Sequence, residues 1–354
     1  MIELAEILRR HWPAYQAKFG DAILPSHRAA VAAILSCRTA QRGGQLYRCA
    51  ECQHEHYAYH SCHHRACPKC GHDQTTEWIA RQQTRLLPVP YFLLTFTVPE
   101  GLRALIRSHQ KIFYTLLFAQ SAATLQEIAA HPKHLGAELG FLGVLHTWSR
   151  QLIFHPHIHY VVPGGGLSSD GLCWMRVKNP DFFLPIKVLA RRFRNRLRQV
   201  LEKDHQDLLK QIPAQVWRQE WIVDAQPVGS GQSALKYLAA YVYRTALGAQ
   251  RLVGEHEGQV TFTYRDSEDG QRKLATVAAE EFIRRFLQHI LPAGFQRVRY
   301  FGWWSAAAKK RWQRLLTLLD WRAPERPLPD TWLLLCPQCQ KPMQWVKSLP
   351  RAPP

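Results

Sequence analysis

Long apolar segments are absent from this chain of 354 residues, and acidic side chains are scarce relative to basic ones. A run of about 18 apolar residues, the minimum for a membrane-spanning helix, does not occur. The opening residues MIELAE lack the basic start of a secretory signal. These absences predict a cytoplasmic protein with no membrane partner, and the hydrophobic fraction of 46% indicates a folded globular chain.

The charge balance is one-sided, with 46 Lys and Arg against 27 Asp and Glu and a formal net charge of +19. Such a chain favours polyanionic partners, and aromatic side chains interleaved with the basic ones suit stacking on unpaired bases. The densest basic cluster lies in a predicted helix over 186–209. It comprises Arg191, Arg192, Arg194, Arg196 and Arg198. We expect this helix to help hold a nucleic acid; the alternative is an ordinary basic surface.

Nine cysteines in a reducing compartment predict metal sites in preference to disulfides. Two Cys-x-x-Cys pairs, separated by a short Tyr- and His-rich segment, have the arrangement of a structural zinc ribbon. Their members are Cys49, Cys52, Cys67 and Cys70. Four thiolates close a tetrahedral zinc site, so this ion should stabilise the fold and not react.

The remaining clustered cysteines leave the number of zinc ions open at one or two. Cys37 and Cys62 could hold a second ion with a neighbouring histidine, or with the lone pair Cys336 and Cys339 near the C-terminus. The alternative for Cys37 and Cys62 is a role as buried apolar thiols.

Three histidines occupy alternate positions in the segment 154–163, which leads into three glycines. Side chains of a β-strand alternate between its faces, so these imidazoles are predicted to share one face. His157 and His159 would lie about 7 Å apart at the backbone, close enough for both to bind one divalent cation. A third ligand is not determined by the sequence. The candidates are His146, Gln151, His155 and Glu220. The alternative is a solvated strand face with no metal.

Tyr237 and Tyr241 are four residues apart in a helix predicted to begin near Ser233, so they lie one turn apart on one face. A phenol has a pKa near 10 and is a poor nucleophile at neutral pH. A divalent ion on a phosphate oxygen, expected to be Mg²⁺ or Mn²⁺, would favour attack by Tyr237 on a phosphodiester. The products would be a 5′-phosphotyrosine link and a free 3′ hydroxyl. A second tyrosine favours strand transfer over simple nicking. The alternative is that the two tyrosines only pack in the core or at its rim and take no part in chemistry.

The order of predicted elements indicates an α/β or α+β core with the histidine strand central. We expect helices over 1–35, 73–87, 100–130, 186–209 and from 233, and strands over 91–98, 140–147, 154–163, 174–177 and 217–225. A hairpin over 259–264 and 272–277 and a mainly helical, aromatic and basic region over 278–319 complete the chain. The predicted domains are 1–87, 88–265 and 266–354.

His157-Ile158-His159 resembles the signature of the HUH single-strand endonucleases, and Tyr237-Leu238-Ala239-Ala240-Tyr241 resembles that of their two-tyrosine branch. With the cysteine motifs, most of the chain resembles transposases of the insertion sequence 91 family. The further segments that carry this resemblance are Cys37-Arg38-Thr39, Ser61-Cys62, Cys67-Pro68-Lys69-Cys70, Leu87-Pro88-Val89-Pro90-Tyr91, His146-Thr147-Trp148 and Pro163-Gly164-Gly165-Gly166.

The resemblance implies a rolling-circle transposase that cleaves and rejoins single-stranded DNA of element ends and target, in the bacterial cytoplasm with the nucleoid. It implies an α+β fold with a ferredoxin-like HUH nuclease core, an N-terminal helical and zinc-ribbon module that recognises DNA, and a C-terminal helical region. No basic residue lies between the two tyrosines, so Lys236 or Arg244 is expected to contact the phosphate.

Two other functions are compatible with these motifs. A replication initiator or relaxase would use the same histidines and tyrosines, and a non-catalytic zinc-dependent DNA-binding protein would use neither. The sequence leaves the oligomeric state, the target sequence and the order of tyrosine use open.

Overall fold

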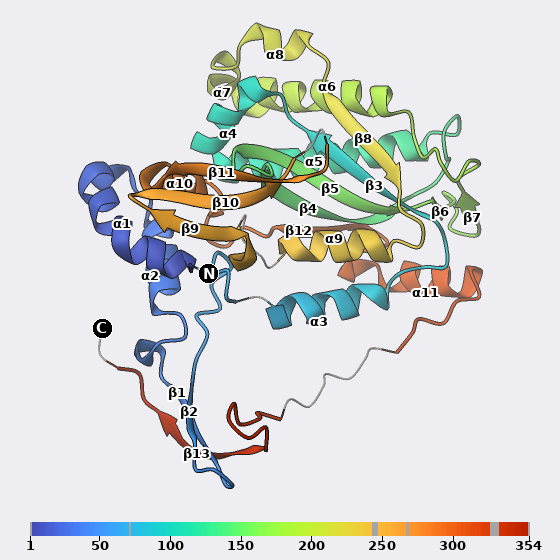
Figure 1. Cartoon of the computed structure of the whole chain (residues 1–354). Helices are drawn as coiled ribbons and strands as arrows, with labels where there is room; N and C mark the ends of the chain where they lie inside the picture. Colours follow the sequence, from blue (N-terminus) through green and yellow to red (C-terminus); the bar gives the residue numbers. More distant parts are fainter. Residues whose placement is uncertain (1, 71, 243–246, 267–268, 326–332, 353–354) are drawn as a thin grey trace. The chain divides into compact units, whose positions relative to one another are not determined.

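The computed structural model describes residues 2–70, 72–242, 247–266, 269–325 and 333–352 (Figure 1). The chain forms two compact units. One, the terminal unit, comprises Met1–Thr75, Tyr243–Ile290 and Arg326–Pro354; the other, the central unit, comprises Thr76–Val242 and Leu291–Glu325. This division differs from the three consecutive domains expected, because both ends of the sequence belong to the same unit.

The central unit is built on a five-stranded antiparallel sheet with the order β12-β4-β5-β3-β8. The strands are β3 (Tyr91–Thr97), β4 (Gly140–Trp148), β5 (Phe154–Pro163), β8 (Ile222–Pro227) and β12 (Val298–Gly302). The helix α5 (Gln110–Ala130) lies between β3 and β4 in the chain, and α6 (Ile186–Asp204) lies between β5 and β8. This βαββαβ order, with β5 central, is the ferredoxin-like arrangement, so the predicted α+β fold and the central histidine strand are confirmed.

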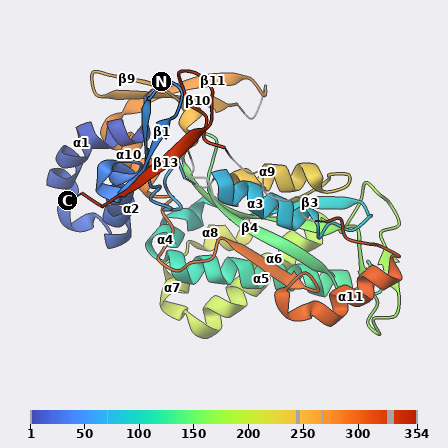
Figure 2. The same ribbon diagram turned by 90° about the horizontal axis from the view of Figure 1, so that it is seen from below.

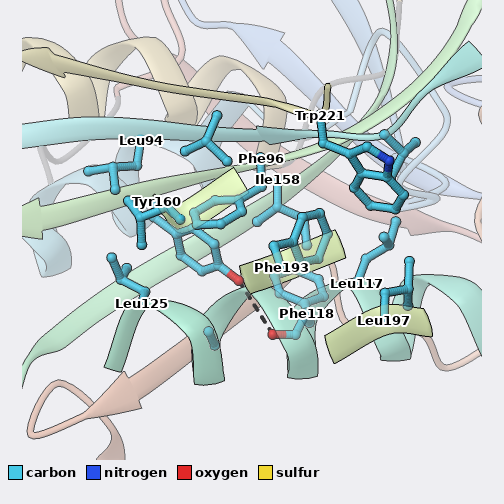
Figure 3. Packing of buried hydrophobic residues seen from close by; sticks show 14 of the residues in the cluster. Leu94, Phe96, Leu117, Phe118, Leu125, Ile158, Tyr160, Phe193, Leu197 and Trp221 are labelled. Carbon is cyan, nitrogen blue, oxygen red and sulfur yellow. Dashed lines mark hydrogen bonds between the residues drawn. The ribbon is translucent and has the colours of Figure 1, made fainter. Parts of the chain in front are cut away.

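One face of this sheet carries the hydrophobic core (Figure 3). Phe96 of β3 lies with its ring centroid 5.7 Å from that of Tyr160 on β5 and 5.3 Å from that of Phe193 on α6. The Tyr160 hydroxyl shares a 2.6 Å hydrogen bond with Ser121 of α5. Because side chains alternate along β5, burial of Ile158 and Tyr160 on this face places the histidines on the other.

Ile158 connects the histidine motif to the core, since only 1% of its surface is exposed. Ile158→Ala should lower the free energy of unfolding by about 2–5 kcal/mol, because it leaves a cavity between β5 and the helices. The matched variant Ile158→Val removes one methyl group and should cost about 0.5–1.5 kcal/mol. Urea unfolding followed by tryptophan fluorescence measures both values. Equal stabilities for the two variants would contradict this packing.

The other elements of the central unit connect or flank the sheet. They are α3 (His72–Gln83), whose first residues belong to the terminal unit, α4 (Arg103–Ser108), β6 (Gly165–Leu167), β7 (Trp174–Arg176), α7 (Gln206–Lys210), α8 (Ala214–Arg218), α9 (Gln232–Val242) and α11 (Lys309–Leu318). The helix expected over 186–209 is interrupted at His205, between α6 and α7.

Two predicted segments are correct only in part. The strand expected over 217–225 forms only from Ile222 onward, as β8, because Trp217 lies in α8. The indole N–H of Trp221 donates a hydrogen bond to the Val216 carbonyl of this helix. The region expected to be mainly helical over 278–319 contains the helices α10 (Ala279–Leu287) and α11. It also contains the strand β12, because residues 298–302 pair with β4, far away in the sequence.

The terminal unit contains two small antiparallel sheets, β13-β1-β2 and β11-β10-β9. Its elements are α1 (Leu4–Phe19), α2 (Pro25–Ser36), β1 (Gly44–Cys49), β2 (Glu55–Tyr59), β9 (Leu252–His256), β10 (Gln259–Arg265), β11 (Arg272–Ala278), α10 (Ala279–Leu287) and β13 (Met343–Leu349). The predicted N-terminal helices and the pairing of β10 with β11 are confirmed. The strand β13, which pairs with β1, was not expected (Figure 2). Among the residues that the structure describes, no helix has the length and apolarity needed to cross a membrane.

Candidate active site and cysteine clusters

Three histidines come together on the face of the central sheet opposite the hydrophobic core. His146 on β4 lies directly across from His157 on β5, and His159 follows two residues later on the same face. Their candidate ligand nitrogens all lie within 4.8 Å of one another, so the three imidazoles could bind one metal ion. Of the four candidates for a third ligand, the structure therefore brings His146 to the pair His157 and His159.

The other three candidates have different surroundings. The His155 ring lies 5.1 Å from that of His157, but His155 is outside the group whose ligand atoms converge. Burial and the positive charge of Arg103 lower the His155 pKa to about 4. Gln151 is exposed in the connection between β4 and β5, and Glu220 is exposed just before β8, outside the converging group.

The three clustered imidazoles are neutral at physiological pH. Burial lowers the pKa of His157 to about 4 and the pKa values of His146 and His159 well below the ordinary value. The Nδ1 atom of His157 lies 2.7 Å from the carbonyl oxygen of His155. A carbonyl oxygen only accepts hydrogen bonds, so Nδ1 carries the proton and Nε2 keeps its lone pair. This lone pair is available to a metal ion.

Thr95 on β3 positions the second imidazole. Its hydroxyl lies 2.8 Å from Nδ1 of His159, directly across the β3–β5 pair. The Nε2 atom of His159 is buried and has no hydrogen-bond partner among the described residues. A buried nitrogen without a partner is costly unless something binds it. His159 therefore has the environment of a metal ligand whose other nitrogen is held in place.

Trp148 and Arg297 surround the third imidazole. The His146 ring stacks on the Trp148 ring, with centroids 5.6 Å apart and planes 10° from parallel. The Arg297 guanidinium lies 5.5 Å from the Trp148 ring centroid, and its charge contributes to the lowered pKa of His146. The sequence did not single out Arg297 or Thr95, and it singled out Trp148 only as part of the segment His146-Thr147-Trp148. For Thr95, the pairing of β3 with the histidine strand is the signal that would have identified it.

Tyr237 lies beside this histidine cluster. Its ring centroid is 5.8 Å from that of His159 and 6.4 Å from that of His146. The side chain is 45% exposed, so the phenol is open to a substrate while its ring contacts the imidazoles. The helix α9 thus brings Tyr237 to the same sheet face as the histidines.

The other predicted residues near α9 are described only in part. Lys236 is exposed next to Tyr237. The side chain of Tyr241 and the whole of Arg244 lie outside the described residues. Of the two predicted tyrosines, Tyr237 is the one whose side chain the structure describes, and it lies beside the histidines.

The basic helix α6 is not at this site. Its residues Phe193 and Leu197 belong to the hydrophobic core, so α6 covers the sheet face opposite α9 (Figures 1 and 2). Arg192 and Arg196 both form ion pairs with Glu127 of α5. Arg198 pairs with Glu202, Arg194 donates to the carbonyl of Gln219, and Arg191 is exposed. None of these five arginines belongs to the sheet face that carries the histidines.

Eight of the nine cysteines form two thiol clusters in the terminal unit, and these clusters differ from the predicted grouping. One cluster, here called the N-terminal cluster, consists of Cys37, Cys62, Cys67 and Cys70. The other, here called the end-joining cluster, consists of Cys49, Cys52, Cys336 and Cys339. The predicted ribbon of Cys49, Cys52, Cys67 and Cys70 is therefore wrong, as is a second site that joins Cys37 and Cys62 to the C-terminal pair.

The hairpin of β1 and β2 explains this grouping. Cys49 and Cys52 lie at its turn, whereas Cys37 and Cys62 lie at its open end, where Arg38 donates its N–H to the His60 carbonyl. At about 3.4 Å per residue, β1 separates these ends by about 17 Å. One ion cannot contact both ends.

In the N-terminal cluster the sulfur of Cys70 lies 3.5 Å from those of Cys37 and Cys62, which suits a tetrahedral Cys₄ zinc site.

Comparisons with known proteins match two parts of the chain to families of transposase domains. The chain matches a family described as "Transposase zinc-binding domain" over residues 7–98 and one described as "Putative transposase" over residues 140–311. It is 39% identical over 346 residues to "Putative transposase y4qJ" of Sinorhizobium fredii, covering 93% of this chain and 86% of that protein.

A second relative is "Transposase for insertion sequence element IS801" of Pseudomonas savastanoi pv. phaseolicola. It is 31% identical over 291 residues, which cover 77% of this chain and 68% of the relative. No solved structure matches this chain. The matches to both family models and to these relatives support a DNA-processing enzyme with a structural zinc-binding domain. The chain belongs to the insertion sequence 91 family of transposases.

Proposed function

We propose that this transposase cleaves and rejoins single-stranded DNA at the ends of its element, through covalent phosphotyrosine intermediates in a rolling-circle reaction. The observation that carries the proposal is the position of the Tyr237 phenol, half-exposed beside three neutral histidines, of which His146 and His159 are buried and His157 is half-buried. A nucleophile next to a candidate metal site is the constellation that phosphodiester cleavage requires.

In the proposed reaction the Tyr237 oxygen attacks the phosphorus atom of a phosphodiester. The bond between phosphorus and the 3′ oxygen breaks, the phenol loses its proton, and the departing 3′ oxygen gains one. The 5′ end of the DNA remains joined to Tyr237, so the bond energy is kept for rejoining. Tyr241, one helical turn along α9, is the proposed nucleophile for a second strand.

His146, His157 and His159 are the proposed ligands of the catalytic cation. A divalent ion bound there would withdraw charge from a non-bridging phosphate oxygen and orient the scissile bond. Imidazole nitrogens suit Mn²⁺ better than Mg²⁺, which prefers oxygen ligands. We therefore expect higher activity with Mn²⁺ than with Mg²⁺ at equal concentration.

The partner is proposed to be single-stranded DNA, held at the active site by Lys236 beside the nucleophile and recognised elsewhere by the zinc-binding module. Lys236 is exposed and one residue from Tyr237, so its ammonium can reach a phosphate of the attacked strand. The α6 arginines lie on the other face of the sheet, so we do not expect them to contact the cleaved phosphate.

The test is incubation of the purified protein with single-stranded and duplex oligonucleotides that carry the element ends. Denaturing gels should show a covalent protein–DNA product with single strands and Mn²⁺, and none with EDTA. Binding without cleavage would favour a non-catalytic DNA-binding protein instead. Cleavage at a replication origin, with the element ends left intact, would favour an initiator or relaxase.

A further inference from the structure

The second thiol cluster joins segments from opposite ends of the sequence. Cys49 and Cys52 come from the turn of the β1–β2 hairpin, whereas Cys336 and Cys339 come from the segment before β13. The sulfur of Cys49 lies 3.4 Å from that of Cys339, and the sulfur of Cys52 lies 3.5 Å from that of Cys336. Around a zinc ion with bonds of about 2.3 Å, tetrahedral sulfurs are about 3.8 Å apart. The observed spacing is close to that value.

The two Cys-x-x-Cys segments have the same backbone structure. In the first, Gln53 donates its N–H to the Cys49 carbonyl at 3.0 Å, and Cys49 donates its own to the His54 carbonyl at 3.0 Å. In the second, Gln340 donates its backbone N–H to the Cys336 carbonyl at 2.9 Å, and Cys336 donates its own to the Lys341 carbonyl at 2.8 Å.

The residue after each second cysteine, Gln53 or Gln340, has a positive φ, of 56° or 59°. Non-glycine residues rarely adopt this conformation, so its occurrence at matching positions marks two equivalent turns. Equivalent turns arranged about one point are suited to supply two ligands each.

The strand β13 holds the C-terminal turn in place. It pairs with β1 in an antiparallel register that sets Cys49 opposite Met343 and Gly44 opposite Leu349, and both views show the red strand beside the blue one (Figures 1 and 2). This register brings the start of β13, and the turn before it, to the end of β1 where Cys49 lies.

We propose that Cys49, Cys52, Cys336 and Cys339 form a second structural zinc site, which joins the two ends of the chain. The zinc-binding module then extends beyond residues 7–98, the part that matches the zinc-binding family, and the segment containing β13 completes it. The N-terminal cluster uses ligands from one stretch of sequence, whereas the end-joining site needs closure of a loop between Cys52 and Cys336. This proposal does not depend on the reaction proposed for Tyr237.

The test is the zinc content of the full-length protein, measured by native mass spectrometry together with mapping of alkylated cysteines. The wild type should carry two zinc ions. Cys336→Ser combined with Cys339→Ser should carry one, since a half-site with two thiolates does not close the tetrahedron. In that variant iodoacetamide should modify Cys49 and Cys52 as fast as the exposed Cys173, while the N-terminal cluster stays protected.

Two further variants separate loss of the site from general misfolding. Cys173→Ser changes a cysteine outside both clusters and should keep two ions. Cys339→His should also keep two, because a Cys₃His set still binds zinc. A wild type with one zinc, or a double serine variant that keeps two ions or loses both, would overturn the proposal.

Discussion

Tyr237→Phe is expected to abolish covalent attachment of DNA to the protein and to lower the rate of first-strand cleavage by at least about 1,000-fold. The substitution removes only the attacking oxygen, while the ring that lies 5.8 Å from His159 remains. Folding and DNA binding should therefore stay close to those of the wild type. The covalent product is measured on denaturing gels with a labelled single strand.

The matched control for this variant is Tyr264→Phe, which makes the same chemical change on β10 of the terminal unit. It should form the adduct at the wild-type rate. Tyr241→Phe should retain the first adduct and lose transfer of a second strand. If Tyr237→Phe formed the first adduct normally, the nucleophile would be another residue and the role of α9 would have to be abandoned.

Loss of a candidate metal ligand should lower the rate of DNA cleavage about as much as Tyr237→Phe does. His157→Ala or His146→Ala leaves two imidazoles from a set of three, and we expect cleavage to fall by about 1,000-fold at low Mn²⁺. Affinity for DNA should change little, because it depends mainly on phosphate contacts made by basic side chains. Higher Mn²⁺ should restore part of the activity, which a loss of folding would not allow.

The same assay decides the identity of the third ligand. His155→Ala, Gln151→Ala and Glu220→Ala should each retain most of the activity, because the converging group contains His146 with His157 and His159. Nearly full activity of His146→Ala, with loss of activity in one of these three, would contradict the assignment. Cleavage rates as a function of Mn²⁺ concentration provide the comparison.

The strands of the core were predictable because their signal is local. Tyr91–Thr97 and Phe154–Pro163 combine β-branched and aromatic residues with a buried face, and both formed as expected. The strands β12 and β13 carry weaker patterns of their own. Their conformation comes from pairing with β4 and β1, which are distant in sequence, so a local pattern could not identify them.

The site shows the same division between local and distant information. Alternation identified His157 and His159, and helical spacing identified Tyr237, because each pair of positions lies within one element. The place of His146 depends on the register of β4 against β5, which the sequence does not state. The cysteines were grouped wrongly for a related reason: neighbouring Cys-x-x-Cys pairs lie at opposite ends of a hairpin, and one pair finds its partner at the other end of the chain.

Peptide mapping of the covalent product tests the central claim most directly. The protein is incubated with a single-stranded element end and Mn²⁺, digested with protease and nuclease, and its peptides are analysed by mass spectrometry. The account predicts a nucleotide attached to Tyr237 through a 5′ phosphate, with a free 3′ hydroxyl on the released strand. Cleaved DNA with no nucleotide on Tyr237 or Tyr241 would contradict it.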